Sequence, residues 1–252
     1  MRILVVLMMV FSLLCTATVS AQIRGETIEY QQGNTVMEGY LAYDDSIKGK
    51  RPGILVVHDW FGMGPYVRAR AQQLASLGYV AFAADIYGKN LRPADSKEAA
   101  RISGELKADR SLLQLRAAAG LDVLRNYPLT NAEKLGAIGY CFGGMTVLEL
   151  ARSGADIAGV VSFHGNLDAV RDSSKIHTSV LVLHGADDPV VPPAQVTAFE
   201  NEMRKAGVDW QLNIYSGAAH NFTNPSSPTY HRQVDKRSFE AMKDFFREIF
   251  GQ

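Results

Sequence analysis

Short apolar segments alternate with longer amphipathic segments along most of this chain, and this alternation limits the possible folds more than any other feature. Residues 53–57 form a continuous apolar run, which is typical of a strand buried on both faces of a parallel sheet. Residues 66–77 then have the spacing of a helix and stop at Gly78. Repetition of this strand–helix unit predicts a mostly parallel sheet with helices on both faces.

The other elements follow from the same patterns. Two opening strands, 28–30 and 35–43, flank a turn at Gln32-Gly33-Asn34. Further strands are expected at 79–84, 135–140, 159–163, 180–183 and 211–215, and helices at 111–125, 144–152, 193–206 and 231–250. The polar segment 91–108 is a candidate surface helix over a site.

The first 21 residues resemble a secretory signal. A basic start at Met1-Arg2 precedes an apolar stretch at 3–14 that is short for a membrane span, and Val19-Ser20-Ala21 offers small residues for cleavage after Ala21. We therefore expect a signal peptide at 1–21, a single domain at 22–252, a periplasmic or secreted location and no stable membrane association after cleavage. The alternatives are an uncleaved anchor and a lipoprotein signal ending at Cys15.

Charge and residue spacing argue against two classes of partner. The chain has 26 basic and 26 acidic side chains and a formal net charge of zero, without a run of Lys or Arg. We therefore expect no nucleic-acid partner and a small-molecule substrate instead. The His residues lack a tight ligand spacing and cleavage leaves one Cys, so we expect no metal site and no cofactor.

The hexapeptide Gly139-Tyr140-Cys141-Phe142-Gly143-Gly144 lies between a predicted strand and a predicted helix. This is the context of the nucleophile elbow Gly-x-Ser-x-Gly of α/β-hydrolases, here with Cys in place of Ser. Glycines two residues before and after the nucleophile allow a strained turn to form. The N-terminus of the following helix favours a thiolate, and the Phe142 amide is a candidate oxyanion-hole donor. We therefore predict Cys141 as the nucleophile of an α/β-hydrolase fold.

Two later segments supply an acid and a His in the order that α/β-hydrolases use. Asp188 follows one predicted strand, and His220 follows the last one. In this arrangement Asp188 orients His220, and His220 takes the proton of the Cys141 thiol. Attack on a carbonyl then gives an acyl-thioester that water cleaves.

Both assignments have simpler alternatives. Asp187 or Asp188 could instead cap the helix that begins near Pro192. His58, His164 and His184 also end apolar segments, so each of them alone is a candidate base or a hydrogen-bonded core His. We prefer His220 because of its order in the chain and because the small residues Gly217-Ala218-Ala219 let its loop approach the nucleophile.

On these residues the chain resembles the dienelactone hydrolase family, and in particular an exported subgroup with undefined substrates. The matching segments are 58–62, 84–88, 139–144, 184–192 and 220–222. The resemblance implies an α/β-hydrolase fold, cleavage of a carboxylic ester or lactone of carboxymethylenebutenolidase type, and triad roles for Cys141, Asp188 and His220. It also implies that the Trp60 amide is the second oxyanion-hole donor and that the protein is a monomer or a weak homo-oligomer.

The chain departs from the family pattern at two places. Family members often have Glu at the position of Asp59, where it helps to activate the thiol, and Asp is one methylene shorter. Asp59 is therefore a candidate for activation, with a turn carboxylate as the alternative. Members that cleave dienelactone bind its carboxylate with two Arg, but this chain has Lys89 and Asn224 there. Our candidate substrate contacts are Trp60, Tyr87, Lys89, Phe222 and Asn224.

Other activities fit the same motifs. Thioesterases and peptidases use the same acyl-transfer chemistry, so a thioesterase or peptidase on this triad is one alternative. A binding or redox-sensing protein that kept the fold without catalysis is another. The motifs do not identify the physiological substrate.

Overall fold

The computed structural model describes residues 22–168 and 173–251. The expected signal peptide at 1–21 lies outside the described residues. Within the described ranges, no helix combines the length and the apolar character needed to cross a membrane.

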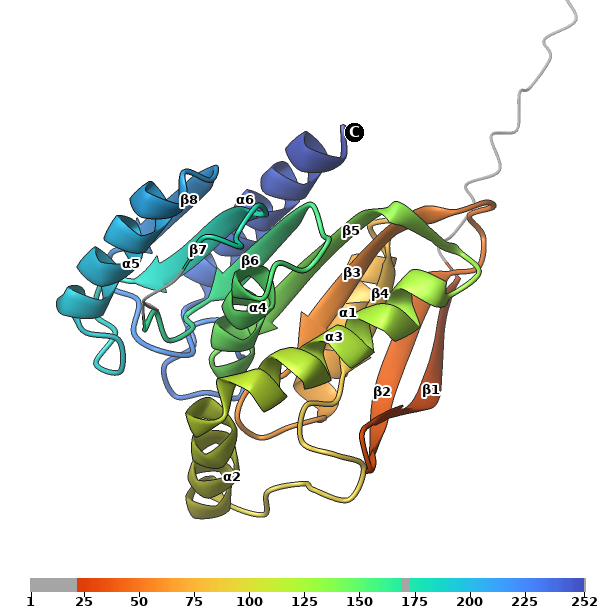
Figure 1. The fold of residues 1–252 in the computed structure, drawn as a ribbon, viewed down its shortest axis with the longest axis horizontal. Helices are drawn as coiled ribbons and strands as arrows, with labels where there is room; N and C mark the ends of the chain where they lie inside the picture. The colour runs from red at the N-terminus through yellow and green to blue at the C-terminus, as the bar shows by residue number, and fades with distance from the viewer. Residues whose placement is uncertain (1–21, 169–172, 252) are drawn as a thin grey trace, which may run out of the picture.

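An eight-stranded sheet in the order β1-β2-β4-β3-β5-β6-β7-β8 forms the centre of the fold (Figure 1). The strands are β1 (Ile23–Gln32), β2 (Thr35–Asp44), β3 (Arg51–Val57), β4 (Val80–Ala84), β5 (Thr130–Tyr140), β6 (Gly159–Phe163), β7 (Ser179–Gly185) and β8 (Trp210–Tyr215). The β1–β2 and β2–β4 pairs are antiparallel, whereas the pairs from β4 through β8 are parallel. The predicted mostly parallel sheet is confirmed.

Helices cover both faces of this sheet (Figure 1). They are α1 (Pro65–Ala75), α2 (Ser96–Ala108), α3 (Arg110–Asn126), α4 (Phe142–Arg152), α5 (Pro193–Ala206) and α6 (Arg232–Phe250). Leu55 of β3 packs in the cluster that includes α3 and α4, while its neighbours Ile54 and Val56 pack in the cluster that includes α1 and α6. Successive residues therefore enter opposite apolar layers, which is why the central strands are continuous apolar runs.

Several predicted elements differ from the structure in length, and β5, for example, begins at Thr130, five residues before the predicted start. Strand β1 begins at Ile23, five residues before the predicted start, because its pairing with β2 continues to Ile23 opposite Asp44. Helix α2 begins only at Ser96, after its N-cap Asp95, whose side chain accepts the N–H of Glu98. The carboxyl ends of the parallel strands share one edge of the sheet, and this edge carries the segments predicted to hold the site.

Candidate active site

Cys141 follows β5 directly and caps the N-terminus of α4 with φ 54° and ψ −113°. A non-glycine residue rarely adopts such a positive φ, which costs roughly 1–3 kcal/mol. A Cβ on Gly139 would lie 1.9 Å from the carbonyl oxygen of Gly143, and one on Gly143 would lie 2.3 Å from that of Val57. The two glycines are therefore required by close backbone contacts, and the turn has the geometry expected of a nucleophile elbow.

The structure brings Cys141, His220 and Asp188 into one hydrogen-bonded line. His220 Nε2 lies 3.1 Å from Cys141 Sγ, and His220 Nδ1 lies 2.8 Å from Asp188 Oδ2. The other carboxylate oxygen of Asp188 accepts the backbone N–H of Val190 at 2.8 Å and that of Val191 at 3.2 Å. The Asp188 side chain is fully buried, so these bonds fix its orientation toward the imidazole.

The charges in this line support one another. Burial lowers the pKa of His220, but hydrogen bonds with Asp188 and Cys141 outweigh burial and raise the pKa to about 9. Burial raises the pKa of Asp188, but the hydrogen bond with His220 and the two backbone N–H groups hold it below its ordinary value. The arrangement thus favours an ionised Asp188 beside an imidazole that readily takes a proton.

The other candidate bases have different partners. His58 Nδ1 donates to the carbonyl of Asp59 at 2.6 Å, and its Nε2 accepts the N–H of Ile86 at 3.1 Å. His164 accepts the backbone N–H of Cys141 instead of contacting its sulfur. Burial lowers the pKa of His58, His164 and His184. Among the described residues, the ring that forms a hydrogen bond with Cys141 Sγ is that of His220.

A cavity of about 780 Å³ opens at Cys141. One face of helix α2 forms a wall of this cavity, and the residues of α2 that line it recur with helical spacing. They are Ser96, Ala100, Ser103, Gly104 and Lys107. The opposite side comes from the loop after β3 and from the loop that carries His220. Their lining residues are Asp59, Trp60, Phe61, Val190, His220, Asn221, Asn224, Ser226, Ser227, Pro228 and Thr229.

Besides Cys141 and His220, three of the predicted residues line this cavity: Asp59, Trp60 and Asn224. The Asp59 carboxylate accepts the N–H of Phe61 at 2.8 Å, as a carboxylate that organises its own turn would. Burial raises the pKa of Asp59, and the same group faces the cavity that contains the Cys141 side chain. Its position is therefore compatible with both roles considered from the sequence.

The structure does not place Tyr87, Phe222 or Lys89 on the cavity surface, contrary to their predicted substrate contacts. Tyr87 and Phe222 are fully buried, and the Tyr87 hydroxyl donates to the carbonyl of Trp60 at 2.9 Å. The ammonium of Lys89 pairs with Glu29 on β1. Tyr87 and Phe222 therefore pack in the core, and Lys89 is engaged in an ion pair. The hydrogen bond from Tyr87 holds the loop that contains Trp60.

Sequence reasoning missed most of the polar lining of the cavity, including Lys107 and Asn166. Lys107 Nζ donates to Asn166 Oδ1 at 2.8 Å, and both residues line the cavity. The signal that could have found Lys107 is its spacing of 3, 4, 7 and 11 residues from the small residues on the same face of α2. Across the described ranges, no group of three or more His, Cys, Asp or Glu side chains is arranged to hold a metal ion.

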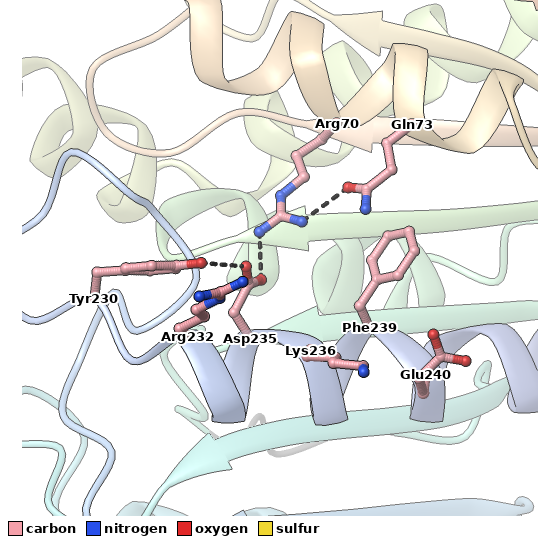
Figure 2. A pocket seen from close by; sticks show the side chains of 8 residues that line it. All are labelled: Arg70, Gln73, Tyr230, Arg232, Asp235, Lys236, Phe239 and Glu240. Carbon is pink, nitrogen blue, oxygen red and sulfur yellow. Dashed lines mark hydrogen bonds and ion pairs between the residues drawn. The ribbon is translucent and has the colours of Figure 1, made fainter.

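A buried Arg fixes the loop that carries His220. Arg70 of α1 donates to the carbonyl of Thr223 at 2.7 Å and forms an ion pair with Asp235 of α6 at 2.5 Å. Figure 2 shows this pair beside Gln73 and Tyr230, at a surface cavity of about 290 Å³. The Arg70 side chain is 9% exposed, so it ties together α1, α6 and the loop from within the protein.

We expect Arg70→Met to lower the free energy of unfolding by about 3 kcal/mol or more, because it leaves the Asp235 carboxylate without its partner in a mostly buried setting. Urea denaturation measures this change. The matched control is Arg247→Met on α6, which breaks an exposed pair with Asp244 and should change stability by less than about 1 kcal/mol. Equal losses in the two variants would contradict the role given to Arg70.

Comparisons with known proteins place the chain in a family. The model of the dienelactone hydrolase family matches residues 37–250. A solved structure called m3DLH has a TM-score of 0.87 and 38% identity, and the match covers 90% of this chain and 98% of that one. A dienelactone hydrolase-like promiscuous phosphotriesterase from metagenomic libraries has a TM-score of 0.87 and 36% identity, covering 91% and 99%. A Salmonella typhimurium protein named as a carboxymethylenebutenolidase is 25% identical over 229 residues, which cover 86% of this chain and 84% of the relative.

Proposed function

Because this chain belongs to the dienelactone hydrolase family and is a carboxylic ester hydrolase, we propose that it cleaves a small ester or lactone with the triad Cys141–His220–Asp188. The observation that carries the proposal is the unbroken line of hydrogen bonds from Asp188 through His220 to Cys141 Sγ. Asp188 holds the imidazole with Nε2 directed at the thiol, as the acid of a hydrolytic triad does.

In the first half of the reaction, His220 takes the thiol proton and Cys141 Sγ attacks the carbonyl carbon. The tetrahedral oxyanion is stabilised by the backbone N–H groups of Phe142 and Trp60. Its collapse breaks the carbon–oxygen bond, and the departing alkoxide takes the proton from His220. In a lactone this alcohol stays attached to the acyl group. The product of this half is an acyl-thioester on Cys141.

In the second half, His220 removes a proton from water, and the resulting hydroxide attacks the thioester carbon. Collapse of this intermediate breaks the carbon–sulfur bond. The Cys141 sulfur takes back the proton held by His220, and the acid product leaves. We assign Asp59 a supporting part, since its carboxylate faces the cavity that contains the thiol.

The acyl-thioester itself is the test of this proposal. Mixing the protein with a substoichiometric activated ester and quenching in acid within a turnover should add the mass of one acyl group to the peptide that contains Cys141. Peptide mapping by mass spectrometry measures this addition. An acyl group found on another residue, or no acylation during active turnover, would contradict the mechanism.

A panel of substrates distinguishes the proposed esterase from the alternative activities. One acyl group presented as an ester, a thioester and an amide separates the proposed esterase from a thioesterase or a peptidase on the same triad. A phosphotriester belongs in the same panel, because a relative with 36% identity is described as a promiscuous phosphotriesterase. A binding or redox-sensing protein would turn over none of these substrates.

We expect Lys107→Gln to lower kcat/KM about tenfold for a 4-nitrophenyl ester whose acyl chain ends in a carboxylate, while the uncharged ester of equal length changes little. Lys107 is half-buried at the cavity, and within residues 22–168 and 173–251 its side chain donates to the neutral amide of Asn166. A substrate carboxylate would give the Lys107 ammonium a charged partner. Steady-state kinetics on both esters measures the effect.

The matched control for this prediction is Lys97→Gln, since Lys97 lies on the same helix but is exposed and does not line the cavity. It should leave the ratio of the two kcat/KM values unchanged. Equal losses on both esters in the Lys107 variant would show that Lys107 does not recognise charge.

A further inference from the structure

His164 is a buried titratable residue that the proposed reaction does not use. It follows β6 directly, is fully buried and has a φ of 40°. Positive φ is uncommon outside glycine, and among the described non-glycine residues it occurs here, at Cys141 and at Asn221. All three residues lie at the edge of the sheet that carries the site. A strained residue persists only where its surroundings hold it in place. The contacts of His164 therefore show what holds this conformation and which groups it connects.

The contacts of His164 define its tautomer. Nδ1 accepts the backbone N–H of Cys141 at 3.2 Å, so Nδ1 carries no proton. Nε2 therefore carries the proton and donates it to Thr223 Oγ1 at 2.7 Å. Burial and the nearby His220 hold the pKa of His164 well below its ordinary value, in agreement with a neutral ring. Both ring nitrogens are thus used, and neither is available as a base.

The partner on the far side of the ring is itself firmly held. Thr223 is fully buried, and its hydroxyl also forms a hydrogen bond with the hydroxyl of Tyr66 at 2.7 Å. Its carbonyl accepts a hydrogen bond from Arg70. Thr223 lies three residues after His220, in the same loop. The His164 ring consequently joins the backbone of the nucleophile to the loop that carries the base.

The His164 ring also contacts the base directly. Its centroid lies 5.3 Å from that of His220, and the two planes are inclined by 64°. On another side it packs against Phe222, with a centroid distance of 5.0 Å. The imidazole of His220 therefore packs, in a T-shaped contact, against a ring whose two nitrogens are both hydrogen-bonded. This contact limits the movement of His220 Nε2 relative to Cys141 Sγ.

We propose that His164 is a positioning residue, which sets the distance between Cys141 Sγ and His220 Nε2 by linking the Cys141 N–H to Thr223. This inference rests on the proposed function, since it gives His164 a role only if Cys141 and His220 react together. The N–H of Cys141 also bonds to the carbonyl of Phe163 at 3.0 Å, which continues the pairing of β5 with β6. That bond fixes the strand, whereas the bond with His164 reaches the loop that carries the base.

Thr223→Val is the most selective test, because it removes the acceptor of Nε2–H without changing the ring or the strained backbone of His164. We expect kcat for 4-nitrophenyl acetate to fall about tenfold with little change in KM, since small displacements of reacting groups act on the chemical step. The matched control is Thr178→Val, which removes an equally buried hydroxyl at the opposite edge of the sheet. Its kcat should stay at the wild-type value.

A second readout follows the thiol without any ester. The rate of alkylation of Cys141 by iodoacetamide, measured against pH, reports how well His220 activates the sulfur. In Thr223→Val the alkylation rate near neutral pH should fall severalfold, whereas Thr178→Val should keep the wild-type rate. The alkylation measurement also separates failure of the proposed function from failure of the role proposed for His164. If Cys141→Ala still hydrolyses esters, the proposed function is wrong, but the alkylation profile still tests His164.

Substitution of His164 completes the test. His164→Asn keeps a side-chain oxygen that can accept the Cys141 N–H, and Asn tolerates positive φ. His164→Leu lacks an acceptor. We expect kcat to decrease in the order wild type, His164→Asn, His164→Leu. If the Leu variant does not fold, Thr223→Val and His164→Asn decide the outcome. Folded variants with the kcat and alkylation profile of the wild type would overturn the proposal.

Discussion

Replacing Cys141 with Ala is expected to lower kcat/KM for 4-nitrophenyl acetate by about 10⁴-fold or more, because the reaction loses the atom proposed to form the covalent intermediate. His220 and the two proposed oxyanion-hole amides remain in place, so the residual rate would come from them acting on water. Stopped assays on highly purified protein measure this change. Purity matters, since a trace of another esterase would hide a loss of this size.

The Ala variant should fold normally, because the Cys141 side chain is partly exposed rather than enclosed in the core. Its sulfur also forms just one side-chain hydrogen bond among the described residues, with His220. Circular dichroism and thermal melting check this. The companion variant is Cys141→Ser, which keeps a nucleophilic atom of similar position. We expect it to retain weak activity, since a hydroxyl must be deprotonated more fully than a thiol. Unchanged turnover in the Ala variant would refute the assignment of Cys141.

The second large effect is expected for Asp188→Asn, which should lower kcat by about 10³- to 10⁴-fold. Asn can still accept the N–H groups of Val190 and Val191 with its oxygen, so the loop should keep its shape. Its NH₂ group would then face His220 Nδ1 and favour the tautomer whose Nε2 carries a proton. That nitrogen could no longer take the proton of the thiol.

The same substitution has a consequence for protonation. The pKa of His220, about 9 in the wild type, is raised by the hydrogen bonds with Asp188 and Cys141 against the effect of burial. Removing the carboxylate should therefore lower it, so that the imidazolium loses its proton at a lower pH. NMR titration of the imidazole nitrogens measures this shift. A pKa that stays near 9 would show that Asp188 does not hold the charge of His220.

The matched control is Asp187→Asn, because Asp187 is the neighbouring carboxylate but is exposed. It should change neither kcat nor the titration of His220. If the two Asn variants behaved alike, the acid of the triad would have to be sought elsewhere.

The central sheet and the elbow could be predicted because their physics is local. A strand buried on both faces must be apolar at every position, as β3 is, and a strained turn at Cys141 requires glycines at fixed offsets. The edge strand β1 was predicted too short for the opposite reason. Its first half is exposed and polar at most positions, so the sequence carries little sign of the pairing with β2.

The surroundings of the site were less predictable, because residue type does not distinguish packing from substrate contact. Phe222 and Trp60 are both aromatic residues in loops at the catalytic edge, yet one is fully buried and the other lines the cavity. Lys89 was assigned by analogy with a family position, but the carboxylate of Glu29 on a distant strand takes its charge. Lys107 shows the opposite error, since it lines the cavity but was not predicted. A charged residue in a polar segment looks like an ordinary surface residue.

The order of the strands has a consequence for how this protein matures during synthesis. From β5 to β8 each new strand is added beside the previous one. Cys141 therefore leaves the ribosome together with the centre of this series, 79 residues before its proposed base His220. Until β8 and the loop after it have joined the sheet, Cys141 has no imidazole to activate it. If His220 activates Cys141 as proposed, we therefore expect the growing chain to carry an unactivated thiol until the loop after β8 is in place.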